Sequence, residues 1–261
     1  MDRERSRHYL RAMGVQVWRR RDHDGAAEQA DIDPAPPELA AQTTLREPPK
    51  TSGPQLERPD KVTSKGAQVA DPAGMDWGLL SRAVSSCRAC ELHETRTQTV
   101  FGVGNHEADL MIIGEAPGAD EDRQGEPFVG RAGHLLNLML QAIGLTREQV
   151  YIANILKCRP PGNRDPRPDE ARHCKPYLMR QIALVQPRVL LSVGRISAQN
   201  LLETDTPIGR LRGHWREFGP GRTPLMVTYH PAYLLRSPEQ KSRAWKDLLQ
   251  VAHRLREASE N

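Results

Sequence analysis

The sequence predicts an α/β domain, a three-layer α/β/α arrangement around a central, mostly parallel sheet of four strands, preceded by a disordered amino-terminal extension. Short apolar runs alternate with helical periodicity along residues 75–258, which is typical of a parallel sheet covered on both faces. Residues 1–74 hold 8 of the 21 prolines, and residues 24–74 contain no aromatic side chain. Such a segment cannot bury enough apolar surface to offset the entropy lost on ordering. We therefore expect a mostly disordered arm over residues 1–74 and one domain over residues 75–258.

One part of the arm has helical spacing. Leu10, Met13 and Trp18 fall on one face of a short amphipathic helix near residues 7–20, which Gly14 interrupts. Two interpretations stay open. The segment is either a marginal helix within the arm or a peptide that docks in a groove of a protein partner.

Within the domain, the strands and helices follow from periodicity. Four short, mostly aliphatic or β-branched runs predict the strands: Leu110–Ile113, Val150–Leu156, Val189–Val193 and Leu225–Tyr229. Apolar residues at helical spacing predict helices over Asp76–Leu92, Ala132–Ile143, Asp169–Val185, Arg195–Leu202 and Pro238–Glu257. In sheets of this kind, ligands bind beyond the carboxyl ends of the strands. The residues that follow the strands are therefore candidates for a binding site.

Polar or unusual residues follow three of the four predicted strands. Gly114, Glu115 and Ala116 come directly after the first strand. Asn154 lies near the end of the second strand, and His230 follows the fourth. Because parallel strands end at the same edge of a sheet, we expect these side chains to converge on one cleft.

Charge and hydropathy restrict the class of protein. The net charge is +4, and the whole excess lies after residue 74, where 25 Lys and Arg face 21 Asp and Glu. This mild excess suits a polyanionic partner if it gathers on one face. No run approaches the ~20 apolar residues of a membrane span, and the first residues lack the apolar core of a signal peptide. We expect a cytoplasmic protein that does not bind membranes and whose cysteines are not in disulfides.

The four cysteines form two pairs of unequal spacing. Cys87 and Cys90 are separated by two residues, and Cys158 and Cys174 by fifteen. Cys87 and Cys90 lie among charged residues, which disfavours four unrelated buried thiols. Four thiolates can hold a structural zinc ion or a [4Fe–4S] cluster. The spacing by itself favours neither.

Three longer motifs, together with the cysteines, resemble the family 4 uracil-DNA glycosylases. They are GEAPGADEDRQGEPFVGRAG from Gly114, NILKCRPPGNRDPRP from Asn154 and HPAYLL from His230. The resemblance extends over about residues 77–255 in the same order. It implies the uracil-DNA glycosylase fold and a [4Fe–4S] cluster whose ligands are Cys87, Cys90, Cys158 and Cys174. It also implies a DNA-repair hydrolase that cuts the N-glycosidic bond of uracil and leaves an abasic site.

The same resemblance implies roles for single residues. The uracil-binding residues would be Gly114, Glu115, Ala116, Phe128, Asn154 and His230. Phe128 would stack on the extruded base, and Asn154 would hydrogen-bond to its Watson–Crick edge. His230 would be catalytic at the O2 side of the departing base. The reaction chemistry, and not the resemblance, makes Glu115 the nearest candidate for a catalytic residue that orients the attacking water.

Each of these residues also has a purely structural interpretation. Phe128 could belong to the core, Asn154 could cap a strand, His230 could lie in a turn, and Glu115 could be structural. For the whole protein, the alternative function is a non-catalytic DNA-binding module of the same fold, attached to replication or repair machinery. A zinc-stabilised interaction protein is a third interpretation. We expect a monomer whose partner is uracil-containing DNA, single- or double-stranded.

Overall fold

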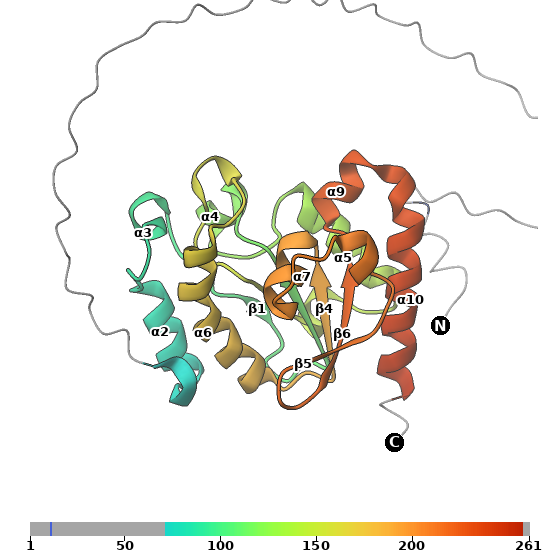
Figure 1. Cartoon of the computed structure of the whole chain (residues 1–261), viewed down its shortest axis with the longest axis horizontal. Helices are drawn as coiled ribbons and strands as arrows, with labels where there is room; N and C mark the ends of the chain where they lie inside the picture. Colours follow the sequence, from blue (N-terminus) through green and yellow to red (C-terminus); the bar gives the residue numbers. More distant parts are fainter. Residues whose placement is uncertain (1–10, 12–70, 258–261) are drawn as a thin grey trace, which may run out of the picture. The chain divides into compact units, whose positions relative to one another are not determined.

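The computed structural model describes Arg11 and residues 71–257, which form a central sheet with helices on both faces (Figure 1). The expectations for the arm, including the amphipathic helix near residues 7–20, lie outside the described residues. No helix in the described part of the chain is long and apolar enough to cross a membrane. The α/β class predicted from the sequence is confirmed.

The sheet has a parallel centre and two antiparallel edges. In chain order its strands are β1 (Val103–Gly104), β2 (Leu110–Gly114), β3 (Tyr151–Asn154), β4 (Val189–Val193), β5 (Arg216–Phe218) and β6 (Thr223–Thr228). Their spatial order is β1-β3-β2-β4-β6-β5. The four central strands β3, β2, β4 and β6 run parallel, as predicted, and β1 and β5 pair antiparallel at the edges.

The prediction of four strands was therefore incomplete, because six are present among the described residues. Strand β1 contains only two residues, which is too few to show alternation. Strand β5 exposes Arg216 and Glu217, so it contains no apolar run that could indicate a strand. Edge strands of this kind are held by backbone pairing, which periodicity does not detect.

The helices lie in two layers. They are α2 (Trp77–Ser85), α3 (Leu92–Thr95), α4 (Ala119–Gln124), α5 (Arg131–Ala142), α6 (Pro168–Val185), α7 (Arg195–Leu202), α8 (Ile208–Leu211), α9 (Pro231–Arg236) and α10 (Lys241–Glu257). Helices α5, α9 and α10 cover one face of the sheet, and α6, α7 and α8 cover the other. Successive residues of β2 alternate between the two apolar clusters, which places Ile112 on the α5 side and Ile113 on the α6 side.

Two predicted helices begin or end elsewhere. The helix expected over Asp76–Leu92 ends at Ser85, so Cys87 and Cys90 lie in a loop before α3. The hydroxyl groups of Ser85 and Ser86 each donate to the carbonyl of Arg82 at 2.9 Å, and such local bonds compete with continuation of a helix. The final helix begins at Lys241, because residues 238–240 form a 3₁₀ turn.

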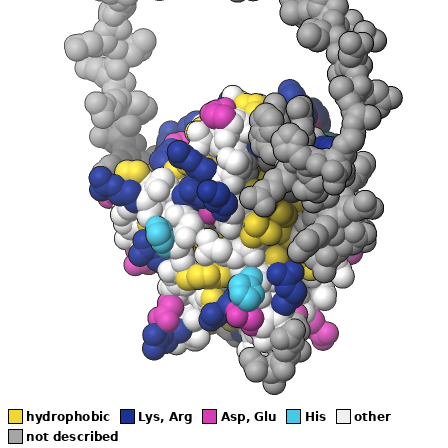
Figure 2. Space-filling model, turned by 90° about the vertical axis from the view of Figure 1, so that its right-hand side faces the viewer, with side chains coloured by type: hydrophobic (Ala, Val, Ile, Leu, Met, Phe, Trp, Pro, Cys, Tyr) yellow, Lys and Arg dark blue, Asp and Glu magenta, His cyan; other side chains and the backbone are white. Residues whose placement is uncertain are grey.

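The surface beside α10 is mixed in charge. Figure 2 shows this face, on which Lys and Arg side chains are interspersed with Asp and Glu. The net positive charge of the chain therefore does not mark this face as a binding surface for a polyanion. The candidate binding residues lie instead at the carboxyl ends of the strands.

A buried carboxylate fastens α10 to the sheet. Asp247 is fully buried and accepts hydrogen bonds from the Thr228 hydroxyl at 2.8 Å and from Arg212 Nε at 3.0 Å and Nη2 at 2.5 Å. Burial raises the pKa of Asp247, while these donors oppose the rise. Because Thr228 ends β6 two residues before His230, the same contacts hold the turn that carries this histidine.

We predict that Asp247→Ala lowers the free energy of unfolding by about 3 kcal/mol, because it leaves the charge of Arg212 and the hydroxyl of Thr228 without their buried partner. Urea denaturation followed by circular dichroism measures the change. The matched control is Asp205→Ala at an exposed aspartate, which should shift stability by less than about 0.5 kcal/mol. Equal effects of the two substitutions would contradict this account.

Candidate active site

The carboxyl ends of β2 and β3 bring Gly114 and Asn154 side by side. They are paired in the parallel register of the two strands. A Cβ atom on Gly114 would lie 2.3 Å from Asn154 Oδ1 and 2.7 Å from ring atoms Cε2 and Cζ of Phe128. Only a residue without a side chain therefore allows Asn154 and Phe128 to lie against the end of β2. Three of the predicted site residues meet at this point.

His230 joins this group from the end of β6. Its imidazole stacks on the Phe128 ring with 5.5 Å between centroids and 29° between planes. Gly194, with φ 101°, lies behind it, and a Cβ there would be only 3.0 Å from His230 Cβ. The expected convergence of residues at the strand ends is thus present for Gly114, Phe128, Asn154 and His230.

The protonation state of His230 follows from its surroundings. Burial, together with the charge of the nearby Arg236 and against the opposing effect of Glu121, lowers its pKa to about 4, so the ring is neutral at physiological pH. Its Nδ1 atom accepts a hydrogen bond from the Ala232 backbone amide at 3.1 Å, at the start of α9. A nitrogen that accepts carries no proton, so the single proton of the ring is on Nε2. His230 is therefore a neutral donor through Nε2.

The carboxyl group of Glu115 has a raised pKa. Burial and, to a smaller extent, the charge of Asp165 raise the pKa of its carboxyl group to about 7, against an opposing effect of Arg195. Asp165 and Arg195 are themselves ion-paired at 2.5 Å. A carboxyl group with such a pKa can accept a proton near neutral pH. Ala116, by contrast, packs against the apolar cluster under α6 and α7.

Phe128 has a strained backbone, and two charged side chains hold the main chain around it. Its φ of 56° is rare for a residue with a side chain. The Glu121 carboxylate accepts from the amides of Val129 at 3.0 Å and Gly130 at 3.1 Å, and from Gly118 at 3.1 Å. Arg147 donates to the carbonyl of Phe128 at 3.3 Å and also to that of Pro127. Strain of this kind persists only where the surroundings hold it.

Glu121 and Arg147 were missed by the sequence analysis. Glu121 lies three residues after Gly118, the residue before α4, and a carboxylate at this position reaches back to the amide at the helix start. That spacing could have identified Glu121. Arg147 lies in a turn 19 residues after Phe128, and no sequence pattern connects the two.

The four cysteines surround one small cavity, together with side chains from α2, α3 and α6. Cys158 follows β3, Cys174 lies in α6, and Arg96 Nη1 donates to Cys158 Sγ at 3.0 Å. Burial raises the pKa of Cys174 to about 12 and also raises those of Cys90 and Cys158. Among the described residues, no three His, Cys, Asp or Glu side chains converge closely enough to hold a single metal ion.

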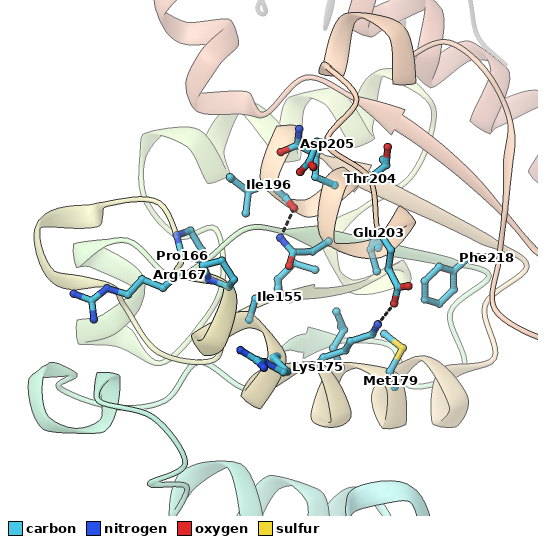
Figure 3. A pocket seen from close by; sticks show the side chains of 17 residues that line it. Ile155, Pro166, Arg167, Lys175, Met179, Ile196, Glu203, Thr204, Asp205 and Phe218 are labelled. Carbon is cyan, nitrogen blue, oxygen red and sulfur yellow. Dashed lines mark hydrogen bonds and ion pairs between the residues drawn. The ribbon is translucent and has the colours of Figure 1, made fainter. Parts of the chain in front are cut away.

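A larger groove lies elsewhere on the domain (Figure 3). It has a volume of about 490 Å³ and runs between α6 and α7, with Met179 and Phe218 in its wall and an ion pair between Lys175 and Glu203 across it. None of the predicted site residues lines this groove. It therefore plays no part in the cluster at the strand ends.

Comparison with known proteins decides the family. The uracil DNA glycosylase superfamily model matches residues 101–249. The chain is also 46% identical over 177 residues to the type-4 uracil-DNA glycosylase of Archaeoglobus fulgidus, an alignment that covers 65% of this chain and 88% of the relative. The chain belongs to the type-4 uracil-DNA glycosylases. The resemblance seen in the sequence motifs is confirmed.

Two further relatives show how far the sequence similarity extends. The type-4 uracil-DNA glycosylase of Pyrobaculum aerophilum is 41% identical over 180 residues, which are 67% of this chain and 92% of the relative. A DNA polymerase of Bacillus phage SP01 is 30% identical over 158 residues, which are 60% of this chain but 17% of the polymerase. Similarity to the glycosylases thus extends over nearly their whole length.

We predict that Arg147→Met loosens the turn at Phe128, because the carbonyl groups of Pro127 and Phe128 both lose a donor. The free energy of unfolding should fall by about 1–3 kcal/mol. Amide hydrogen exchange of residues 127–130 should become faster. Arg216→Met, at an exposed arginine in β5, is the control and should leave this exchange unchanged. Unchanged exchange in Arg147→Met would show that Arg147 does not hold the turn.

Proposed function

We propose that this protein is a DNA-repair enzyme that hydrolyses the N-glycosidic bond of uracil in DNA, releasing uracil and leaving an abasic site. The observation that supports it most directly is the packing of Phe128, Asn154 and His230 around Gly114 at the strand ends. Two of its relatives are named type-4 uracil-DNA glycosylases and align with it over most of their length. The side chains at this site suit the two parts of the reaction, binding of the base and cleavage of the glycosidic bond.

Binding begins with extrusion of the base from the helix, which costs a few kcal/mol. The Phe128 ring offers a stacking surface, and stacking of a base on an aromatic side chain returns about 1–3 kcal/mol. The Asn154 carboxamide is both a donor and an acceptor, so it can accept from uracil N3–H and donate to O4. Cytosine presents the opposite pattern and would leave buried polar groups unpaired, which makes it the poorer ligand.

His230 acts on the leaving group. As the C1′–N1 bond breaks, its electron pair moves onto the uracil ring and negative charge builds up at O2. The Nε2–H group of the neutral His230 donates to this oxygen, and the bond strengthens as the charge grows. Because Nδ1 is engaged by Ala232, the ring is fixed in the tautomer that this role requires.

Glu115 acts on the nucleophile. Water adds to the positively charged C1′ of the sugar, and the Glu115 carboxylate accepts the proton that the water loses. A pKa of about 7 makes the carboxyl group a competent base at neutral pH. The products are the neutral sugar hydroxyl and the uracil anion, which takes up a proton from solvent. Glu115 releases the proton it accepted to solvent, so the net reaction adds one water across the glycosidic bond.

The four cysteines fit a [4Fe–4S] cluster better than a zinc ion. A zinc ion binds each thiolate at about 2.3 Å, so four sulfurs must converge on one point. In a four-iron cluster each thiolate binds a different iron, which holds the sulfurs farther apart around a central volume. The described thiols enclose a cavity without three of them converging. The ligands would be Cys87, Cys90, Cys158 and Cys174, and the bound cluster would cross-link the loop before α3 to β3 and α6.

The most direct test of the proposed function is uracil release itself. The full chain should release free uracil from an oligonucleotide with one uracil, and His230→Ala should slow this single-turnover step by ~10²–10³-fold because the donor to the oxyanion is lost. Binding of the oligonucleotide should change little. His253→Ala, at an exposed histidine in α10, is the control. If the unaltered protein binds DNA but releases no uracil, it is a non-catalytic binding module.

Another test of the proposed function is the pH dependence of the rate. The rate of uracil release should rise as the pH increases through about 7, because the Glu115 carboxyl group has to lose its proton to act as a base. His230 stays neutral over this range, since its pKa lies at about 4. Glu115→Gln should be slower and should lose this pH dependence. A pH profile of Glu115→Gln that matches the unaltered protein would exclude Glu115 as the base.

Iron binding by the four cysteines is tested by substitution. Replacing Cys87, Cys90, Cys158 or Cys174 with Ala should each lower iron content and stability, because metal binding is coupled to folding. Elemental analysis and thermal denaturation measure the two effects. Ser86→Ala, in the same loop, should retain its iron. Iron content unchanged in all four variants, or one zinc per chain in the unaltered protein, would contradict the cluster.

A further inference from the structure

We propose that Lys157 is a positioning residue for uracil recognition: its side chain holds the backbone of Asn154, and its own backbone lies against the four-cysteine site. This inference rests on the proposed function, because Asn154 is there the residue that binds the edge of the base. Lys157 touches neither the base nor the reacting atoms. It lies between the end of β3 and α6.

The first observation is the burial of the ammonium group. Lys157 is 1% exposed, and its Nζ donates to the backbone carbonyl of Asn154 at 2.9 Å and to Gln181 Oε1 at 2.6 Å. An ammonium group is strongly hydrated in water, so its burial is costly unless good acceptors replace the water. A methionine or leucine would fill the same space without that cost. The bonds to Asn154 and Gln181 are therefore what this lysine contributes.

The second observation is that the acceptor on α6 is itself rigidly held. Gln181 is fully buried, and its Nε2 donates to the Phe101 carbonyl at 2.9 Å and to the Tyr151 hydroxyl at 3.1 Å. Tyr151 is the first residue of β3. Lys157 thus connects the last residue of β3 to a glutamine whose position is set by α6 and by the start of the same strand.

The third observation is where Asn154 lies in the sheet. It is the last residue of β3 in register with β2, opposite Gly114. Its side chain faces Gly114, and its carbonyl is bound by Lys157. Rotation of this terminal peptide would swing the carboxamide away from the base. The ammonium of Lys157 opposes that rotation.

The fourth observation connects this residue to the cysteines. Lys157 precedes Cys158 and is one of the residues that line the cysteine cavity, and its backbone amide donates to the Cys174 thiol. The segment from Asn154 to Cys158 is therefore fixed at both ends, by the sheet and by the cysteine site. A cross-link at the cysteines would limit the movement of Lys157 and, through it, of Asn154.

The experiment is a double-mutant cycle on the full chain. Lys157→Met keeps the length and apolar character of the side chain but removes the donor, and Asn154→Ala removes the group that Lys157 is proposed to position. Two quantities are measured for each variant. They are the single-turnover rate of uracil release and the Kd for an oligonucleotide with 2′-fluoro-deoxyuridine, in which the electron-withdrawing fluorine disfavours cleavage. Iron content and the melting temperature are recorded for every variant, and Lys246→Met, at an exposed lysine in α10, is the matched control.

We expect Lys157→Met to lower the rate by roughly 10–100-fold and to weaken binding of the fluorinated oligonucleotide, because small displacements of a binding group have effects of that size. In the Asn154→Ala background, the same substitution should change either quantity by less than about twofold. An unchanged rate in Lys157→Met would overturn the proposal. So would an equal effect of Lys157→Met with and without the Asn154 side chain.

A second variant covers the case in which Lys157→Met does not fold. Gln181→Met removes the acceptor that anchors the ammonium and leaves Lys157 in place. Its effect on uracil release should be smaller than that of Lys157→Met and should also vanish in the Asn154→Ala background. An effect that persists there would overturn the proposal. Failure of the unaltered protein to release uracil would instead refute the proposed function, which the same assay detects separately.

Discussion

The absence of a side chain at Gly114 is the constraint on which the candidate active site depends. Asn154 Oδ1 and the Phe128 ring occupy the space in which a Cβ would lie. Three further features create this close approach: the parallel register that sets Asn154 opposite Gly114, the turn that places Phe128 against the sheet, and the stacking of His230 on Phe128. Asn154 and Phe128 thus pack directly against the backbone at the end of β2.

Burial sets the acid–base properties of the two catalytic candidates in opposite directions. It favours the neutral form of each group, so it lowers the pKa of His230 and raises that of Glu115. The result is an imidazole that only donates and a carboxyl group that exchanges its proton near neutral pH.

The surroundings of the site are held by ionisable side chains that are buried or half-buried. Glu121 and Arg147 fix the turn at Phe128, Asp247 and Arg212 fix the turn before His230, and Lys157 holds the backbone of Asn154. Each of these groups binds main-chain atoms of the turn or strand end, or a side chain within two residues of a site residue. Such contacts restrict the backbone at the strand ends, where the sheet no longer does so, and this restriction keeps the site preorganised.

The sequence alone determined the α/β class, the four central strands and the residues at their carboxyl ends, because apolar periodicity and chain order are local properties. It also showed the four cysteines and the motifs that carry the family resemblance. Only the tertiary structure decided that α2 ends before Cys87, that β1 and β5 extend the sheet, and that Glu121, Arg147 and Lys157 support the site. These features depend on contacts between residues distant in the chain or on hydrogen bonds to the backbone. Neither kind of contact leaves a periodic signal in the sequence.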